Sequence, residues 1–181
     1  MLPFRTPVPS NLGAIAAGTG GVTLTASGSG ADVTLGSTVS GNSFAATAGT
    51  SGAIRLNDGA ATIVTTSGGG QSYNSPITLL ADATLSDTGN GAISLNGQVT
   101  GGANSLTLSN GTGAQSLNGV TTSGDLVLAT TGTVTLNGGT YTITGGGDPY
   151  VFGAVTTIGT FTFGMNTNFG AVTIAGNTII D

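Results

Sequence analysis

The amino-acid sequence predicts an all-β fold, a parallel β-helix (β-solenoid) in which short strands wind into stacked coils. Three observations predict it. The chain of 181 residues contains 34 glycines and only 5% charged residues, without Lys or Glu, which helix surfaces normally use. Apolar residues alternate with Thr or Ser over three to six residues, which is the pattern of a strand with one buried face. Related segments also recur along the chain.

The many glycines also fit a flexible linker, but two properties argue against disorder. The mean hydropathy is +0.32 and the net charge is only −5. Disordered chains instead combine low hydropathy with high net charge. Because no cysteine is present, no disulfide contributes to stability, which must come from apolar burial and backbone hydrogen bonds.

The repeated unit spans about 40 residues in two related halves, which predicts coils of about 20 residues. The first apolar positions of four similar segments lie 39 (93 − 54), 41 (134 − 93) and 38 (172 − 134) residues apart: Ile54, Ile93, Val134 and Val172. A second element recurs at residues 71–78, 115–122 and, loosely, 150–157. An earlier half lies at residues 30–37. We expect eight or nine coils stacked along one axis.

Four asparagines directly follow a leucine and are predicted to form corners of the coil: Asn57, Asn96, Asn118 and Asn137. Asn tolerates the left-handed backbone conformation, and three of these asparagines precede a glycine, which adopts it freely. We expect these side chains to be structural turn residues, stacked into a ladder of amides between coils.

The two ends of the chain differ from its middle. Residues 1–19 contain Pro3, Pro7 and Pro9, which favour an extended N-terminal arm before a repeat domain at residues 20–181. From about residue 141 the repeat becomes atypical and rich in aromatic residues. Five of these are candidates either for filling wider coils or for a contact surface: Tyr150, Phe152, Phe161, Phe163 and Phe169.

The segment from Gly91 to Gly139, GAISLNGQVTGGANSLTLSNGTGAQSLNGVTTSGDLVLATTGTVTLNGG, resembles the repeats of filamentous haemagglutinin-type bacterial surface proteins. Autotransporter passengers are similar. The resemblance is clear over residues 20–145 and implies an extracellular right-handed parallel β-helix that acts as a stalk, adhesin or filament. The chain is shorter than such proteins, and their N-terminal secretion domain is not visible in it.

The sequence offers little chemistry for an active site. Without His, Lys or Cys, neither a common nucleophilic triad nor a His/Cys zinc site can be built. The two closest acids, Asp82 and Asp87, are expected in a solvated corner rather than as a catalytic pair. Asp32 and Asp148 lie in glycine-rich segments, but these lack the tandem repetition of calcium-binding loops. We therefore predict no catalytic residue, metal or cofactor. Asn110-Gly-Thr112 matches a glycosylation site but is also a common turn.

Together these observations predict a non-enzymatic extracellular structural protein, a subunit or segment of a surface filament or adhesin stalk. Its expected partner is itself, end to end or side by side, with a host surface or carbohydrate as a second partner. The acidic balance argues against nucleic acid, and no apolar run is long enough to span a membrane. Two alternatives remain open: a carbohydrate- or ice-binding module that uses outward Thr and Asn, and a segment of a phage fibre or tail spike.

Overall fold

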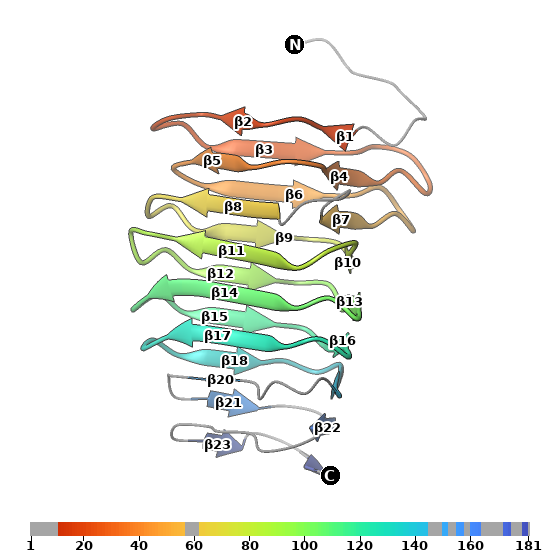
Figure 1. Ribbon diagram of the computed structural model, residues 1–181, viewed down its shortest axis with the longest axis vertical. Coiled ribbons are helices and arrows are strands. Elements are labelled where there is room, and N and C mark those ends of the chain that lie inside the picture. The colour runs from red at the N-terminus through yellow and green to blue at the C-terminus, as the bar shows by residue number, and fades with distance from the viewer. Residues whose placement is uncertain are drawn as a thin grey trace.

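The computed structural model shows an all-β solenoid with three faces (Figure 1). It describes residues 11–56 and 62–144 and, beyond these, five strands at 150–151, 155–157, 160–163, 172–174 and 179–180. No helix occurs in these residues, so none is present there that could cross a membrane. The predicted fold class is confirmed.

The strands alternate between three parallel sheets, named A, B and C here. Sheet A contains β1 (Asn11–Leu12), β4 (Val33–Leu35), β7 (Ile54–Leu56), β10 (Ile77–Leu79), β13 (Val99–Gly102), β16 (Val120–Thr122), β19 (Thr140–Ile143), β22 (Thr160–Phe163) and β24 (Ile179–Ile180). Sheet B contains β2 (Ile15–Ala16), β5 (Val39–Gly41), β8 (Thr62–Thr66), β11 (Ala83–Asp87), β14 (Leu106–Gly111), β17 (Leu126–Thr130) and β20 (Tyr150–Val151). Sheet C contains β3 (Val22–Thr25), β6 (Phe44–Thr47), β9 (Gln71–Tyr73), β12 (Ile93–Leu95), β15 (Gln115–Leu117), β18 (Val134–Leu136), β21 (Val155–Thr157) and β23 (Val172–Ile174).

Each described strand pairs in parallel with the strand one coil away, and up to β22 the chain advances by one coil every three strands. In sheet C, successive strands begin 22 (44 − 22), 27 (71 − 44), 22 (93 − 71), 22 (115 − 93) and 19 (134 − 115) residues apart. The repeat of about 40 residues is therefore two coils, as the spacing from Ile93 to Val134 illustrates. Ile54 lies in sheet A instead, so its distance to Ile93 is not a whole number of coils.

The core is a continuous column of apolar side chains enclosed by the three sheets. Most strands show buried residues on either side of one partly exposed residue, as in Ile93-Ser94-Leu95 and Val134-Thr135-Leu136. Parallel pairing in register stacks Leu95, Leu117 and Leu136 on one another, whereas Ile93 and Val134 both lie next to the buried Gln115. Full burial of one Val, Ile or Leu side chain contributes about 1.5–3 kcal/mol. Alternation in the sequence correctly predicts which residues line this interior.

Strand pairing begins earlier in the chain than residue 20, where the repeat domain was predicted to start. Asn11 and Leu12 pair with Thr34 and Leu35, and Ile15 pairs with Val39. The first coil thus includes part of the segment expected to form an extended arm. The three prolines of that arm lie outside the described residues.

Two glycines that follow turn asparagines provide a matched test of how closely the coils stack. A Cβ on Gly97 would overlap the backbone of Ser75 and Pro76 in the preceding coil, whereas one on Gly138 would meet nothing within 4 Å. Neither glycine has a positive φ. We expect Gly97→Ala to lower the free energy of unfolding by about 1–3 kcal/mol. Gly138→Ala should leave it unchanged or raise it by about 0.4–1 kcal/mol. Urea unfolding checks both; equal effects would contradict this account of the corner.

Candidate functional site

The outward side of sheet C carries two regular rows of small polar side chains. The first, the hydroxyl row, comprises Ser72, Ser94, Ser116 and Thr135, at the centres of four successive strands. The second, the amide row, comprises Asn74, Asn96, Asn118 and Asn137, each directly after its strand. Leu95 pairs with Tyr73 and Leu117, and Leu117 pairs with Leu136. The asparagine after each of these residues therefore stacks on that of the next coil.

Hydrogen bonds between coils hold much of the amide row. The Asn96 Nδ2 donates to Asn74 Oδ1 at 2.8 Å, and Asn74 Nδ2 donates onward to Thr47 Oγ1 at 3.3 Å. Ser72 Oγ also donates to Asn74 Oδ1, at 2.9 Å. In the following coils, Asn118 Nδ2 donates to the Asn96 carbonyl at 3.1 Å, and Asn137 Nδ2 donates to Ser116 Oγ at 2.8 Å. These hydrogen bonds between coils restrict the orientation of the asparagine side chains.

This ladder contains three of the four predicted turn asparagines: Asn96, Asn118 and Asn137. Asn57 lies outside the described residues, and its strand β7 belongs to sheet A rather than sheet C. The fourth member is Asn74, which the Leu-Asn pattern missed because a tyrosine precedes it. The similarity of residues 71–78 to residues 115–122 would have predicted it, because it aligns Asn74 with Asn118.

The backbone at the ladder asparagines differs from the expected left-handed conformation. Among the described non-glycine residues, only Ser51 and Asn90 have a positive φ. After Asn118 and Asn137, a glycine that follows takes the positive φ instead: Gly119 with φ of 92° and Gly139 with φ of 143°. The ladder asparagines themselves therefore do not need the left-handed conformation.

The described part of the outer face of sheet C carries short side chains and no charged residue. Towards the N-terminus, the two rows continue through Ala45 and Thr47, and then through Thr23 and Thr25. A shallow, open hollow of about 380 Å³ lies where strands β6, β9 and β12 begin, lined by Gly69, Gly70, Ala45, Ser72 and Ser94 among others. Its lining combines serines with glycine, alanine and Phe44.

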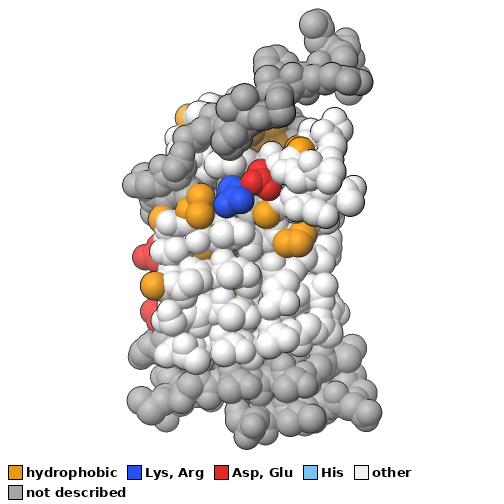
Figure 2. All heavy atoms as spheres, turned by 90° about the vertical axis from the view of Figure 1, so that its right-hand side faces the viewer, with side chains coloured by type: hydrophobic (Ala, Val, Ile, Leu, Met, Phe, Trp, Pro, Cys, Tyr) orange, Lys and Arg blue, Asp and Glu red, His pale blue; other side chains and the backbone are white. Residues whose placement is uncertain are grey.

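Sheet A presents a simpler polar surface, with one outward threonine per coil. Thr78, Thr100, Thr121 and Thr142 pair in register along four neighbouring strands. In the sequence these residues are 22 (100 − 78), 21 (121 − 100) and 21 (142 − 121) positions apart. This distance is about one coil, so threonines that look irregularly spaced in the sequence form a regular row in the structure. Figure 2 views this side of the molecule and shows it as largely uncharged.

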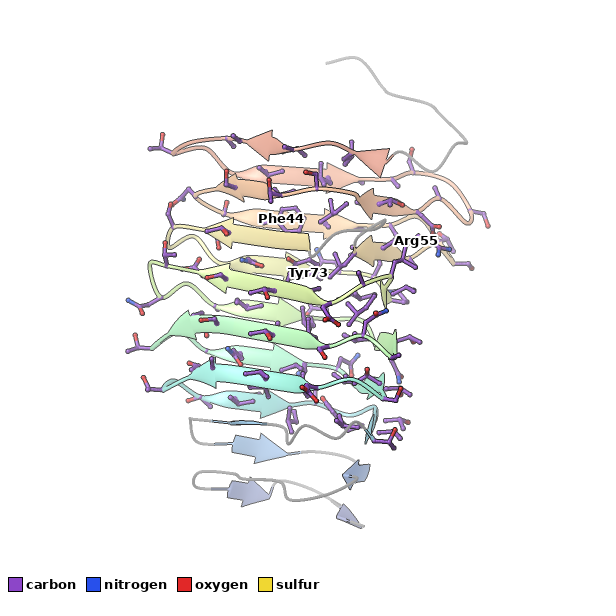
Figure 3. All side chains as sticks on the ribbon, in the orientation of Figure 1. Phe44, Arg55 and Tyr73 are labelled. Carbon is purple, nitrogen blue, oxygen red and sulfur yellow. The ribbon has the colours of Figure 1, made fainter. Side chains whose placement is uncertain are left out.

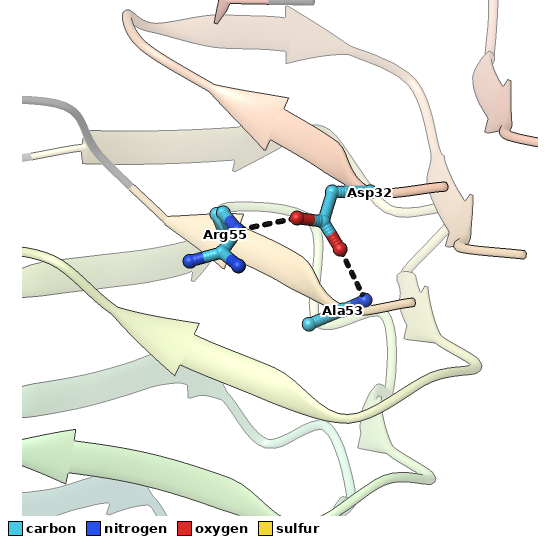
Figure 4. A network of polar contacts seen from close by, with 3 residues as sticks. All are labelled: Asp32, Ala53 and Arg55. Atoms are coloured by element: carbon cyan, nitrogen blue, oxygen red, sulfur yellow. Dashed lines mark hydrogen bonds and ion pairs between the residues drawn. The ribbon is translucent and has the colours of Figure 1, made fainter. Parts of the chain in front are cut away.

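The exception on sheet A is an ion pair between Asp32 and Arg55, labelled in Figure 4. Arg55 Nε donates to Asp32 Oδ2 at 2.6 Å, and the Ala53 amide donates to Asp32 Oδ1 at 2.8 Å. The Ala53 hydrogen bond and the Arg55 guanidinium together lower the pKa of Asp32 below the ordinary value of 3.8. Because the Arg55 side chain is 40% exposed, the pair contributes little to stability. Asp32 is thus a structural link between coils.

Asp87 is buried, with 3% of its surface exposed, which corrects the prediction of a solvated corner. Its Oδ2 accepts hydrogen bonds from Thr66 Oγ1 at 2.7 Å and from the Gly70 amide at 3.0 Å. Its Oδ1 accepts from the amides of Gly89 at 2.9 Å and Gly91 at 2.8 Å. Burial alone would raise the pKa of Asp87, but these donors outweigh it and the pKa is lowered. The carboxylate joins two coils at the corner between sheets B and C.

Asp82 lies at a different corner, between sheets A and B, where it is exposed and accepts from the Ser105 amide at 2.8 Å. The two acids therefore do not form a carboxylate pair. Within the described residues, no group of three or more His, Cys, Asp or Glu is placed to hold a metal ion. Asp148, the other acid considered for calcium, lies outside them.

Asn110 of the glycosylation-like motif is fully buried, and its Nδ2 donates to the carbonyls of Gly91 and Ala114. Asn110 lies in strand β14 and Thr112 in the turn that follows, so the motif spans the end of a strand rather than the predicted turn alone. Of the aromatic residues proposed as a contact surface, Phe161 and Phe163 pair in register with Tyr141 and Ile143, and Tyr150 pairs with Val127. Their side chains, together with Phe152 and Phe169, lie outside the described part of the structure.

The fold and its polar rows define the chain as a parallel β-solenoid repeat protein. No family model, curated protein or solved structure matches it. The resemblance to haemagglutinin-type surface proteins therefore stays a prediction.

Proposed function

We propose that the protein is a non-enzymatic structural solenoid that forms part of an extracellular filament or adhesin stalk. One observation carries the proposal: the three sheets enclose an apolar column and pair coil on coil without interruption by a functional cavity in the described residues. Such a column resists bending because each coil bonds to its neighbours along the axis. A stalk needs this property.

The distribution of charge supports the same proposal. Of the described acids, Asp87 and Asp32 hold neighbouring coils together, while Asp82 and Asp125 lie at corners between sheets A and B. None converges with a second acid or a base on a cleft, as a general acid and base would require. Polar groups instead form rows along the axis, which suits a repeated contact.

The proposal is tested by locating the protein on the cells that produce it. Gold-labelled antibodies against the 181-residue chain, applied to intact cells, should decorate surface fibres in electron micrographs. Antibodies against a cytoplasmic protein serve as the control. Labelling only after cells are permeabilised would overturn the extracellular assignment, and hydrolysis of a polysaccharide by the purified chain would overturn the non-enzymatic one.

A second candidate is a carbohydrate- or ice-binding module, favoured by the two polar rows of sheet C. Regularly spaced hydroxyl and amide groups can hydrogen-bond to a repeating surface. No aromatic side chain contributes to these rows, although aromatic rings supply much of the contact area at many binding sites. Co-sedimentation with insoluble polysaccharides and measurement of ice-growth inhibition test this candidate.

A further inference from the structure

We propose that the outer face of sheet C binds the same face of a second copy, so that two solenoids pair side by side. The face is defined by the hydroxyl row and the amide row. This inference rests on the structural function proposed above and adds the surface through which the rods associate.

Charge favours this face over the others. The chain has a net charge of −5, so association must avoid bringing acids together. The described charges lie elsewhere: Asp32 and Arg55 on sheet A, Asp82 and Asp125 at corners between sheets A and B, and Asp87 inside. Two sheet C faces therefore approach each other without opposing any of these charges.

The spacing of the rows favours a second copy as the occupant. Neighbouring strands repeat every 4.7–4.9 Å or so along the axis, and the four central coils carry the same Ser/Thr and Asn pair. A second copy of this solenoid has the same spacing between coils, so its polar rows can contact the polar rows of the first copy in every coil. A partner with a different repeat would lose register after a few coils.

The side chains also suit a close contact between sheets. Ser, Thr and Asn are short, which allows two sheets to pack at about 10 Å, and stacked Asn side chains occur in such dry interfaces. Each amide has two N–H donors and an oxygen with two lone pairs. The ladder bonds from Asn96 to Asn74 and from Asn118 to Asn96 use only part of this capacity.

The expected contact is small. Sheet C has eight strands of three or four residues. If the residues that flank each strand are counted, such as Asn96 after β12, the face is about five residues wide and covers roughly 600 Å² per copy. The total of about 1,200 Å² lies at the lower limit of specific interfaces. We therefore expect a pair that forms in a concentration-dependent way for this chain and strengthens in proportion to length in a longer solenoid.

The first test is sedimentation of the full chain over a range of concentrations. The wild type should shift from monomer to dimer as the concentration rises. Ser94→Asp combined with Thr135→Asp places two negative charges on the face in alternate coils and should weaken dimerisation at least tenfold. The matched control, Thr100→Asp with Thr142→Asp, adds the same charge to sheet A in alternate coils and should dimerise like the wild type. Circular dichroism verifies that both variants are folded.

The second test uses the absence of cysteine from the chain. Ser94→Cys should be joined into dimers by a short thiol cross-linker, and Thr100→Cys should not. A wild type that stays monomeric, equal effects of the two aspartate pairs, or cross-linking at both positions would overturn the inference. So would loss of binding to an insoluble polysaccharide or to ice, rather than loss of dimerisation, in the sheet C variant. These results are independent of the antibody labelling, which tests the surface location alone.

Discussion

Replacing Asp87 with alanine is expected to lower the free energy of unfolding by about 2–5 kcal/mol. The substitution removes an acceptor shared by Thr66 and several glycine amides. Gly70 and Gly91 are the least exposed of these glycines, and each buried donor left without a partner costs about 1–3 kcal/mol. Urea unfolding followed by circular dichroism measures the loss.

The matched control is Asp125→Ala, which removes a carboxylate at another corner of the solenoid. None of the described hydrogen bonds involves the Asp125 side chain, so we expect a change within about 0.5 kcal/mol. If both substitutions had the same effect, a loss of net charge rather than of the buried acceptor would explain them.

The contribution of Asp87 should also depend on pH, with a sign fixed by its lowered pKa. The folded state holds the pKa below the ordinary value of 3.8, so protons bind more readily to the unfolded chain. The stabilisation is fully present above that value and is lost as the pH falls through the folded pKa. The difference in stability between wild type and Asp87→Ala should therefore shrink below pH 3.8. A difference that grew on acidification would contradict the hydrogen-bonded carboxylate.

Replacing Tyr73 with alanine is expected to cost about 3–5 kcal/mol. The side chain is fully buried, and its ring lies 5.2 Å from that of Phe44 in the preceding coil. Figure 3 labels both residues. Truncation would leave a cavity in the core and remove this ring contact. Thermal unfolding or urea titration checks the value.

Tyr73→Phe separates the hydroxyl from the ring. The Tyr73 hydroxyl donates to Gln71 Oε1 at 2.9 Å, so its loss should cost about 1–3 kcal/mol because that buried oxygen loses its donor. Gln115 offers a comparison within the chain. Two coils further on, Leu117 occupies the position that corresponds to Tyr73. Gln115 Oε1 accordingly has no hydrogen-bond partner in the described structure. Gln115→Leu should therefore cost less than Gln71→Leu. The opposite order would contradict this role for Tyr73.

Local sequence predicted most of the asparagines of the amide row, but it did not predict which asparagines belong to that row. Asn96, Asn118 and Asn137 share a Leu-Asn-Gly signal that marks a corner. Asn57 shares a similar signal yet follows a sheet A strand, while Asn74 lacks the leucine and belongs to the ladder. An asparagine belongs to the amide row only if the strand before it lies in sheet C. The coil length varies between 19 and 27 residues in sheet C, from Phe44 to Val134, so spacing alone does not assign the face.

The sequence by itself determined the all-β solenoid, because alternation of apolar and small polar residues between glycines allows only short strands with one buried side. It also determined the apolar interior, as the buried pair Ile93 and Leu95 illustrates. Only the tertiary structure decided that Asp87 is buried while Asp82 is exposed, since the glycine amides that hold Asp87 come partly from another coil. Likewise, the polar rows of sheet C exist only after coiling, because stacking in register joins side chains about 20 residues apart in the sequence.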